Sequence, residues 1–388
     1  MSVTTGLEAF LHDPPDVVRG QRIGLVTHHA AVDRSLRLAI DRLWEGAAQG
    51  GWRVTRLFGP EHGVRGDYAA GGAVPDSLDP LTGLPVSSLY GAQRKPTGAM
   101  LADVDVLVVD LQDVGARFYT YQVTAAGCVE AGAEHRRPVV ILDRPNPIGG
   151  LAVEGPLLEA GFESFVGRRG QPIRHGLTLG ELARAVNEAE GIGAAVTVVP
   201  CQGWRREQWW DQTGLPWVLP SPNLPTLDTA TVYPGTCLLE GTLLSEGRGT
   251  TRPFEIVGAP WIEPYRWAAA LEERQLRGVR FRPLWFQPMW GKHQGARCGG
   301  VQLHVTDREA FQPVATGVHL IETARRLWPD EFGWRLGGRP GARPHIDLLY
   351  GSAALREQID AGEDAPAIIA QWEKEPFEAV RQRAMVYR

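Results

Sequence analysis

Carboxylates and a histidine stand at the ends of three apolar runs of the sequence. Glu61 and His62 lie in a Pro-Glu-His-Gly turn, Asp110 and Asp113 close the second run, and Asp143 follows the third. Two carboxyl groups that flank a glycosidic bond can cleave it, one of them as the acid. Aspartate and histidine side chains that meet around a divalent ion can instead activate a water molecule. These residue types therefore leave a carboxylate-based hydrolase and a metal-dependent hydrolase open.

The elements that position these residues alternate between strands and helices. Runs rich in valine, isoleucine and leucine predict the strands, and apolar residues at helical spacing predict the helices. This alternation predicts an α/β fold with a mostly parallel sheet, in which ligands bind beyond the carboxyl ends of the strands. We expect strands at residues 22–27, 52–58, 104–111, 138–142 and 194–199, and helices at 35–48, 121–135 and 179–189, the last capped by Thr178 and Glu181.

The pattern changes after residue 230. Residues 234–260 are rich in glycine, proline and threonine, which predicts a loop. The rest of the chain mixes helix and strand patterns, which predicts a smaller α+β part. We therefore expect an α/β domain at residues 1–230 and a smaller α+β domain at residues 231–388. In the second domain we expect helices at 265–274 and 315–327 and strands at 279–286 and 300–305.

Composition narrows the class of protein. The 388 residues include 40 Lys and Arg against 45 Asp and Glu, a net charge of −5, and no basic stripe, so we expect no nucleic acid partner. No apolar run is long enough for membrane insertion. Residues 1–15 lack the pattern of a signal peptide, which predicts a cytoplasmic protein. The four cysteines form no C-x-x-C pair, so neither a disulfide framework nor a zinc ribbon is expected.

Common cofactor and nucleophile motifs are missing from the sequence. No G-x-G-x-x-G follows the first expected strand, no G-x-x-x-x-G-K-[ST] occurs, and no G-x-S-x-G occurs. Nicotinamide enzymes, P-loop enzymes and ordinary α/β-hydrolases therefore lose their main support. We expect no cofactor.

Six segments, in chain order, resemble the exo-β-N-acetylmuramidases of the NamZ type, glycoside hydrolase family 171. They are LFGPEHGVRGD (57–67), LQDVGARFYTY (111–121), LDRPNPIGG (142–150), TGLPWVLPSPNLPT (213–226), YPGTCLLEGTLLSEGRGTTRPFE (233–255) and GAPW (258–261). The resemblance implies an exo-acting glycosidase that releases terminal β-1,4-linked N-acetylmuramic acid from the non-reducing ends of peptidoglycan fragments. It also implies a Rossmann-like domain, a second smaller domain and an active-site cleft between them. His28 and Glu246 stand where this family often has Asn and Val.

The resemblance makes Glu61 the candidate general acid, because the matching glutamate is the family's proposed catalytic residue. The second reacting group stays open. Asp110 or Asp113 can act as base or nucleophile, with Tyr119 and Tyr121 behind them, and the 2-acetamido group of the substrate can attack instead.

N-acetylmuramic acid carries a lactyl carboxylate, for which an arginine fork is the fitting partner. We expect at least one motif arginine to bind it and the others to pair with aspartates. His62 can orient Glu61 or bond a sugar hydroxyl, and asparagine amides can bond other hydroxyls. The candidate substrate-binding residues are His62, Arg65, Asp67, Gln112, Arg117, Tyr121, Asp143, Arg144, Asn146, Asn223 and Arg248.

Two other classes of protein compete with this interpretation. One is a metal-dependent hydrolase or phosphoesterase that uses Asp110, Asp113, Asp143 and His62, although no H-E-x-x-H motif supports a metal and none is expected. The other is a non-catalytic amino-sugar-binding protein. The expected partners are peptidoglycan-derived muramyl saccharides, and self-association into an oligomer stays open.

Overall fold

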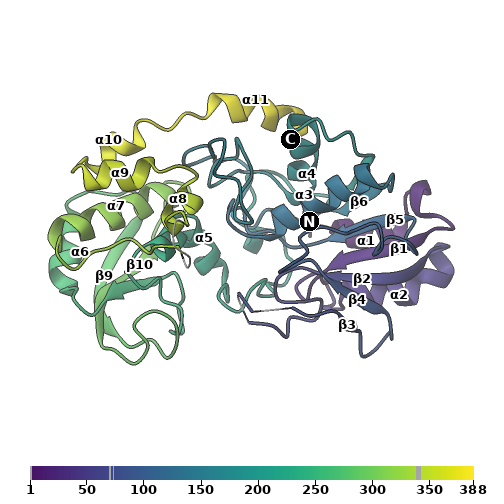
Figure 1. The fold of residues 1–388 in the computed structure, drawn as a ribbon, viewed down its shortest axis with the longest axis horizontal. Coiled ribbons are helices and arrows are strands. Elements are labelled where there is room, and N and C mark those ends of the chain that lie inside the picture. Colours follow the sequence, from purple (N-terminus) through teal and green to yellow (C-terminus); the bar gives the residue numbers. More distant parts are fainter. Residues whose placement is uncertain (1, 70, 73, 338–341) are drawn as a thin grey trace.

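The larger sheet has seven strands in the order β3-β4-β2-β1-β5-β6-β7. All neighbouring strands are parallel except β3 and β4. The predicted α/β fold is therefore confirmed (Figure 1). The structure, a computed structural model, describes residues 2–69, 71–72, 74–337 and 342–388. The strands of this sheet are β1 (Arg22–Thr27), β2 (Arg53–Gly59), β3 (Ser77–Leu78), β4 (Pro85–Ser88), β5 (Val106–Asp110), β6 (Val139–Leu142) and β7 (Val196–Val199).

Each central strand gives alternate side chains to two apolar layers. In β5, Val106 and Val108 pack in the layer that contains α1 and α2, whereas Leu107 and Val109 pack in the layer that contains α3 and α4. Because both faces are covered, the strands are continuous apolar runs. The helices of these layers are α1 (Gly6–His12), α2 (Ala39–Gly50), α3 (Tyr121–Glu134) and α4 (Leu179–Ala189), and a short 3₁₀ turn spans Asp16–Val18.

The predicted bounds are correct for α4 but wrong for the start of α2. Helix α4 matches the prediction at both ends, and Thr178 and Glu181 form the expected capping box. Helix α2 begins at Ala39 rather than at residue 35. The carboxylate of Asp33 accepts hydrogen bonds from the backbone N–H groups of Ser35 and Arg37, which holds this stretch in a turn.

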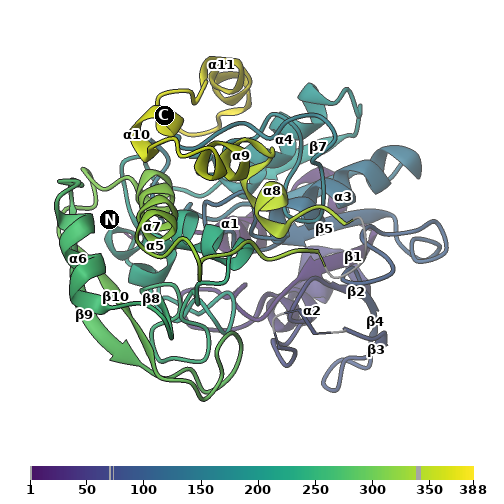
Figure 2. The same ribbon diagram turned by 60° about the vertical axis from the view of Figure 1, so that its left-hand side comes forward.

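The second unit is built on a three-stranded antiparallel sheet in the order β8-β10-β9, and the predicted smaller α+β part is present. Helices α5 and α7 lie side by side (Figure 2), and α6 packs against this sheet. No helix of the described residues is long and apolar enough to cross a membrane. The elements are α5 (Leu227–Thr236), β8 (Ile256–Ala259), α6 (Pro264–Glu272), β9 (Val279–Phe286), β10 (Cys298–Val305), α7 (Pro313–Leu327), α8 (His345–Tyr350), α9 (Ala354–Asp360), α10 (Ala365–Ile369) and α11 (Glu375–Ala384), with 3₁₀ turns at Trp210–Gln212 and Cys237–Gly241.

The prediction of a loop at residues 234–260 is wrong at both ends, where the chain forms the end of α5, a 3₁₀ turn and β8. Gly235 serves close packing here rather than a turn. A Cβ on Gly235 of α5 would lie 1.8 Å from the carbonyl oxygen of Pro313 at the start of α7, and Gly317 meets the Gly235 backbone in the same way. The local composition is the same whether a glycine allows two helices to pack closely or allows a loop to turn, so the sequence alone did not distinguish the two.

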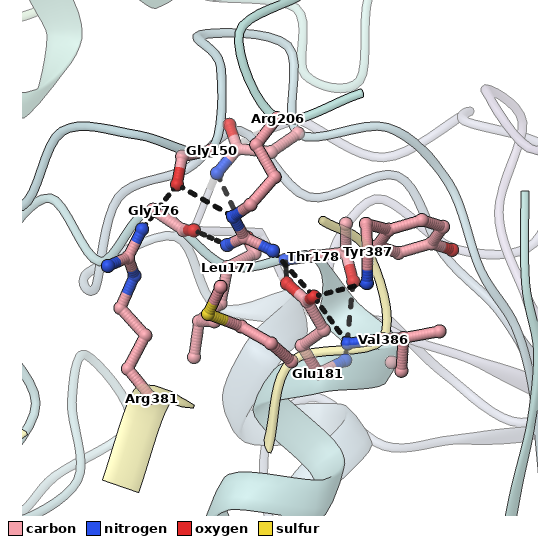
Figure 3. Close-up of polar contacts among 12 residues, drawn as sticks. Gly150, Gly176, Leu177, Thr178, Glu181, Arg206, Arg381, Val386 and Tyr387 are labelled. Carbon is pink, nitrogen blue, oxygen red and sulfur yellow. Dashed lines mark hydrogen bonds and ion pairs between the residues drawn. The ribbon is translucent and has the colours of Figure 1, made fainter. Parts of the chain in front are cut away.

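The C-terminal segment returns to the first unit, where α11 packs on α4 (Figure 1). Figure 3 shows its anchor: Glu181 Oε1 accepts hydrogen bonds from Arg206 Nη1 at 2.6 Å and from the backbone N–H of Val386 at 2.9 Å. Arg381 Nη2 donates to the Gly150 carbonyl at 2.6 Å. Residues 231–388 thus do not stay within one unit, and the division at residue 230 stays a prediction.

A buried ion pair lies at the edge of the large sheet where the strand order reverses, between β1 and β5. Strands β1 and β5 are neighbours there, and Thr27 pairs with Asp110 at their carboxyl ends. Arg144 donates to both carboxylate oxygens of Asp110, from Nε at 2.5 Å and from Nη2 at 2.9 Å. Both side chains are buried. This ion pair fills the place where many α/β sheets bind a ligand.

We expect Asp110→Asn to lower the free energy of unfolding by about 3–5 kcal/mol, because it leaves the Arg144 charge buried and uncompensated. Urea denaturation measures this loss. As a control, Asp211→Asn removes the exposed partner of Arg308 and should cost less than about 1 kcal/mol. Equal, small losses in the two variants would contradict a stabilising role for the buried ion pair.

Candidate active site

A cleft of about 790 Å³ lies between the carboxyl-end loops of the large sheet and the second unit. Glu61, His62 and Tyr119 line it from the first unit, and segments around Glu240 and Arg248 line it from the second. The cleft expected between the two units is therefore present. It brings together five of the predicted site residues: Glu61, His62, Tyr119, Asn223 and Arg248.

Glu61 is held by uncharged donors. Its Oε2 accepts a hydrogen bond from the Thr120 hydroxyl at 2.9 Å, and its Oε1 accepts one from the backbone N–H of Gly71 at 2.9 Å. No cation pairs with Glu61 within the described residues. Thr120 precedes α3, so a loop after β5 fixes a carboxylate that follows β2. The side chain is partly exposed in the cleft and can reach a bound sugar.

His62 adopts a left-handed backbone conformation, with φ of 73°, and Gly63 follows with φ of 74°. Such a conformation is rare for a residue with a side chain and is a mark of functional sites. His62 Nδ1 lies 3.0 Å from the Tyr68 carbonyl oxygen, which can only accept, so Nδ1 carries the proton. In the neutral ring, Nε2 is then a free acceptor.

Two buried tyrosines fix the loops behind Glu61, and one of them bonds the Glu61 turn itself. The Tyr121 hydroxyl donates to the Glu61 carbonyl at 3.0 Å, and the Tyr119 hydroxyl donates to the Pro220 carbonyl at 2.8 Å. Tyr119 lines the cleft, but Tyr121 is fully buried behind it. The ring of His28 packs edge-on against Tyr121 with centroids 4.6 Å apart.

Burial, aided by the charge of Glu61, raises the pKa of Tyr90 to about 12, so this cleft residue stays a neutral phenol.

Aromatic rings form the floor of the cleft between the two units. Tyr233 contacts Phe118 and Phe254 edge-on, at centroid distances of 5.3 Å and 4.8 Å. The rings of Tyr119 and Tyr233 are 6.4 Å apart, which joins the first unit to the second. An apolar floor of this kind suits the apolar face of a sugar ring.

The wall from the second unit is charged. Arg248 Nη1 lies 2.8 Å from Glu240 Oε1 and 3.3 Å from Glu246 Oε1. Lys292 Nζ lies 3.1 Å from Glu246 Oε2, and Arg335 lines the cleft without an ion pair in the described part of the chain. Among the described residues of this wall, three cations thus face two carboxylates, which leaves one positive charge.

Asp110, Arg144, Asp113 and Gln112 do not line the cleft. Asp110 and Arg144 pair with each other. Asp113 accepts from the Gly115 backbone N–H at 2.7 Å and lies 3.3 Å from His175 Nε2, and Gln112 donates to backbone carbonyls. All four side chains are buried and outside the cleft lining, so the structure places neither aspartate where it can contact a substrate in the cleft.

Asp143 and Asn146 are also buried away from the cleft. Asp143 accepts hydrogen bonds from the hydroxyls of Thr178 and Tyr387, both at 2.6 Å, and burial raises its pKa to about 6. Asn146 donates to the Leu177 carbonyl at 2.9 Å. These two side chains fix the loop after β6 and do not bind ligand in this arrangement.

Two predicted arginines have structural partners instead of the cleft. Arg65 pairs with Asp79 at 2.8 Å and with Asp41 at 3.2 Å, and Asp67, its expected neighbour, is exposed outside the cleft. Arg117 is fully buried, and burial lowers its pKa to about 9. Its guanidinium donates to four backbone carbonyls, those of Pro156, Gln171, Leu349 and Tyr350, at 2.5–2.9 Å.

Sequence reasoning missed several cleft residues. Glu240 and Glu246 lie within the motif quoted for residues 233–255, where their spacing from Arg248 was an available signal. Thr120 lies within the motif at 111–121. Tyr90, Lys292, Arg335 and His345 lie in segments without a motif, and only the fold brings them to the cleft.

The residues proposed for a metal site are dispersed. Asp110, Asp113, Asp143 and His62 each bond a different partner. Among all the residues that the structure describes, no group of three or more histidine, cysteine or acidic side chains is close enough to hold a metal ion.

Family models place this cleft in a known context. The N-terminal model of exo-β-N-acetylmuramidase NamZ matches residues 23–228, and the C-terminal model matches residues 231–387. The chain belongs to the NamZ family. The resemblance inferred from the motifs and the glycosidase class are therefore confirmed.

Relatives and solved structures agree with membership of the NamZ family. The chain is 46% identical over 387 residues to the peptidoglycan β-N-acetylmuramidase NamZ of Bacillus subtilis, covering 99% of this chain and 91% of the relative. Two crystal structures of DUF1343 family proteins from Bacteroides fragilis match all of this chain and 99% of their own, with TM-scores of 0.90 and 0.76 and identities of 35% and 31%. The two-unit fold is thus that of the NamZ family.

We expect Arg117→Lys to lower the free energy of unfolding by about 2–4 kcal/mol, because a lysine cannot satisfy four buried carbonyls at once. Guanidinium chloride denaturation measures the loss. Arg53→Lys, at an exposed arginine on β2, is the control and should change stability by less than about 0.5 kcal/mol. If Arg117→Lys is as stable as this control, the structural role is wrong.

Proposed function

We propose that this chain is an exo-acting β-N-acetylmuramidase that releases terminal N-acetylmuramic acid from the non-reducing ends of peptidoglycan fragments, with Glu61 as the general acid. Membership of the NamZ family and the name of the Bacillus subtilis relative support the reaction and the substrate class. The observation that carries the assignment of the acid is the position of Glu61 in the cleft. It is a partly exposed carboxyl group on a braced turn, and no cation pairs with it in the part of the chain that the structure describes.

Glu61 in its protonated form donates its proton to the glycosidic oxygen as the bond to the anomeric carbon breaks. Thr120 and the Gly71 N–H fix the carboxyl group, and the Tyr121 contact fixes its backbone. A fixed acid matters because proton transfer requires hydrogen-bond distance to the leaving oxygen. Water supplies the hydroxyl that ends on the anomeric carbon, and its other proton restores Glu61.

The charge of the second wall favours a muramyl over a glucosaminyl sugar. One uncompensated positive charge on that wall matches the single lactyl carboxylate that distinguishes the two sugars. Arg335 is the exposed cation without an ion pair in the described residues, and Arg248 uses only Nη1 for Glu240 and Glu246. We assign the lactyl carboxylate to these two arginines.

We expect Glu61→Gln to lower kcat at least a thousandfold on a muramyl-glucosamine disaccharide, whose leaving hydroxyl needs a proton. On a 4-nitrophenyl β-N-acetylmuramide the loss should be much smaller, because nitrophenolate leaves without an acid. Glu45→Gln, an exposed surface change, is the control. Equal losses on both substrates would remove the acid role from Glu61. Release of disaccharides rather than monosaccharides from a muramyl-terminated tetrasaccharide would overturn the exo mode.

We expect Arg335→Gln to raise KM for the muramide about tenfold and to leave kcat within twofold, because it removes a charge that attracts the ground-state carboxylate. Steady-state kinetics with the nitrophenyl muramide measures both constants. Arg53→Gln removes an exposed arginine elsewhere and should leave both unchanged. An unchanged KM in Arg335→Gln would contradict the assignment of the lactyl carboxylate to this residue.

A further inference from the structure

The proposed reaction needs more than an acid. As the glycosidic bond breaks, positive charge develops on the sugar ring, and glycosidases commonly face that charge with a second carboxylate. Asp110 and Asp113 are bonded elsewhere in the fold and do not line the cleft. The carboxylates that do line it, in the described residues, are Glu61, Glu240 and Glu246. The second carboxylate must then come from the second unit.

Glu240 has the environment of a carboxylate that stays ionised. It ends the 3₁₀ turn after α5, and its Oε1 lies 2.8 Å from Arg248 Nη1. Its Oε2 lies 3.8 Å from His345 Nε2. Burial by itself would raise the pKa of Glu240, but the charge of Arg248 together with hydrogen bonds from His345 and Arg248 lowers it. Glu240 therefore lies against a cation, whereas Glu61 accepts hydrogen bonds from uncharged donors.

The aromatic floor links the two carboxylates. The charge of Glu61 acts on Tyr119, and the charge of Glu240 acts on Tyr233, raising the pKa of each phenol beyond the effect of burial. The two rings are 6.4 Å apart, and both line the cleft together with Glu61 and Glu240. A sugar ring seated on these tyrosines lies in the same cleft as both carboxylates.

Glu246 is a weaker candidate, although it shares Arg248 with Glu240. Its side chain is 5% exposed, against 14% for Glu240. Its Oε2 is buried next to Lys292, whose ammonium group is itself fixed by the carbonyls of Leu239 and Leu244 at 2.8 Å. Two cations thus neutralise Glu246, and no free oxygen faces a ligand.

We propose that Glu240 is the second carboxylate of the active site, and that it stabilises the positive charge that forms on the sugar ring in the transition state. Glu240 takes up no proton and forms no bond in this step. Glu61 protonates the leaving oxygen, and water ends on the anomeric carbon. This inference rests on the proposed function, because it assumes that a sugar is cleaved in this cleft.

The test measures charge recognition without relying on turnover. An iminosugar analogue of N-acetylmuramic acid, protonated on its ring nitrogen, mimics the charged transition state, and the 1,5-anhydro analogue is its neutral match. We expect Glu240→Gln to weaken binding of the iminosugar at least thirtyfold and binding of the anhydro sugar less than threefold, by isothermal titration calorimetry. In the same variant, kcat should fall at least a hundredfold while KM stays within threefold.

Two variants serve as matched comparisons. Glu246→Gln removes a charge from the other side of Arg248 and should weaken iminosugar binding less than fivefold. Glu240→Asp keeps the charge and should bind the iminosugar at least fivefold tighter than Glu240→Gln does, which keeps the test decisive if Glu240→Gln folds poorly. Thermal denaturation of each variant reports on folding.

The results separate the two proposals. Equal losses for the charged and the neutral analogue, or equal effects of Glu240→Gln and Glu246→Gln, would overturn the role of Glu240 while leaving the muramidase intact. If wild-type protein binds neither analogue and cleaves no muramide, the proposed function itself fails, and the role of Glu240 fails with it.

Discussion

The buried guanidinium of Arg117 is the contact on which the shape of the active site depends. It donates to carbonyls of Pro156 and Gln171 in the first unit and of Leu349 and Tyr350 in the second. A site whose reacting groups come from two units works only if their spacing is fixed to a fraction of an ångström. Arg117 fixes that spacing with four hydrogen bonds next to Leu349, which itself lines the cleft.

Two other contacts support the same joint. Glu154 in the first unit accepts a hydrogen bond from the Ala315 N–H at the start of α7, and burial raises the pKa of Glu154 to about 7. The Tyr387 hydroxyl near the C-terminus bonds Asp143 after β6. The chain therefore runs from the first unit to the second and returns to the first at its C-terminus. These two contacts stabilise the arrangement of the units on either side of the cleft.

Within this frame the two carboxyl groups proposed for catalysis have contrasting supports. Glu61 follows a buried strand on a turn that holds His62 in a left-handed conformation, which costs about 1–3 kcal/mol and persists because Tyr68 and Tyr121 bond the same turn. Its carboxyl group meets only neutral donors. Glu240 instead lies against Arg248. The cleft thus contains one carboxyl group that bonds uncharged donors and one that is paired with an arginine.

The sequence by itself determined the α/β pattern, five of the seven strands of the large sheet, the family and Glu61 as the candidate acid. Continuous apolar strands and the Pro-Glu-His-Gly turn are local features, and local features are readable without a structure. From the sequence alone, the four arginines of the motifs were equally good candidates for binding the lactyl carboxylate. Only the tertiary structure decided that Arg65 and Arg144 pair with Asp79 and Asp110, that Arg117 binds carbonyls, and that Arg248 alone reaches the cleft. An arginine fork fits a carboxylate of the protein as well as one of a ligand, and which it meets depends on residues distant in the chain that folding brings within 3 Å.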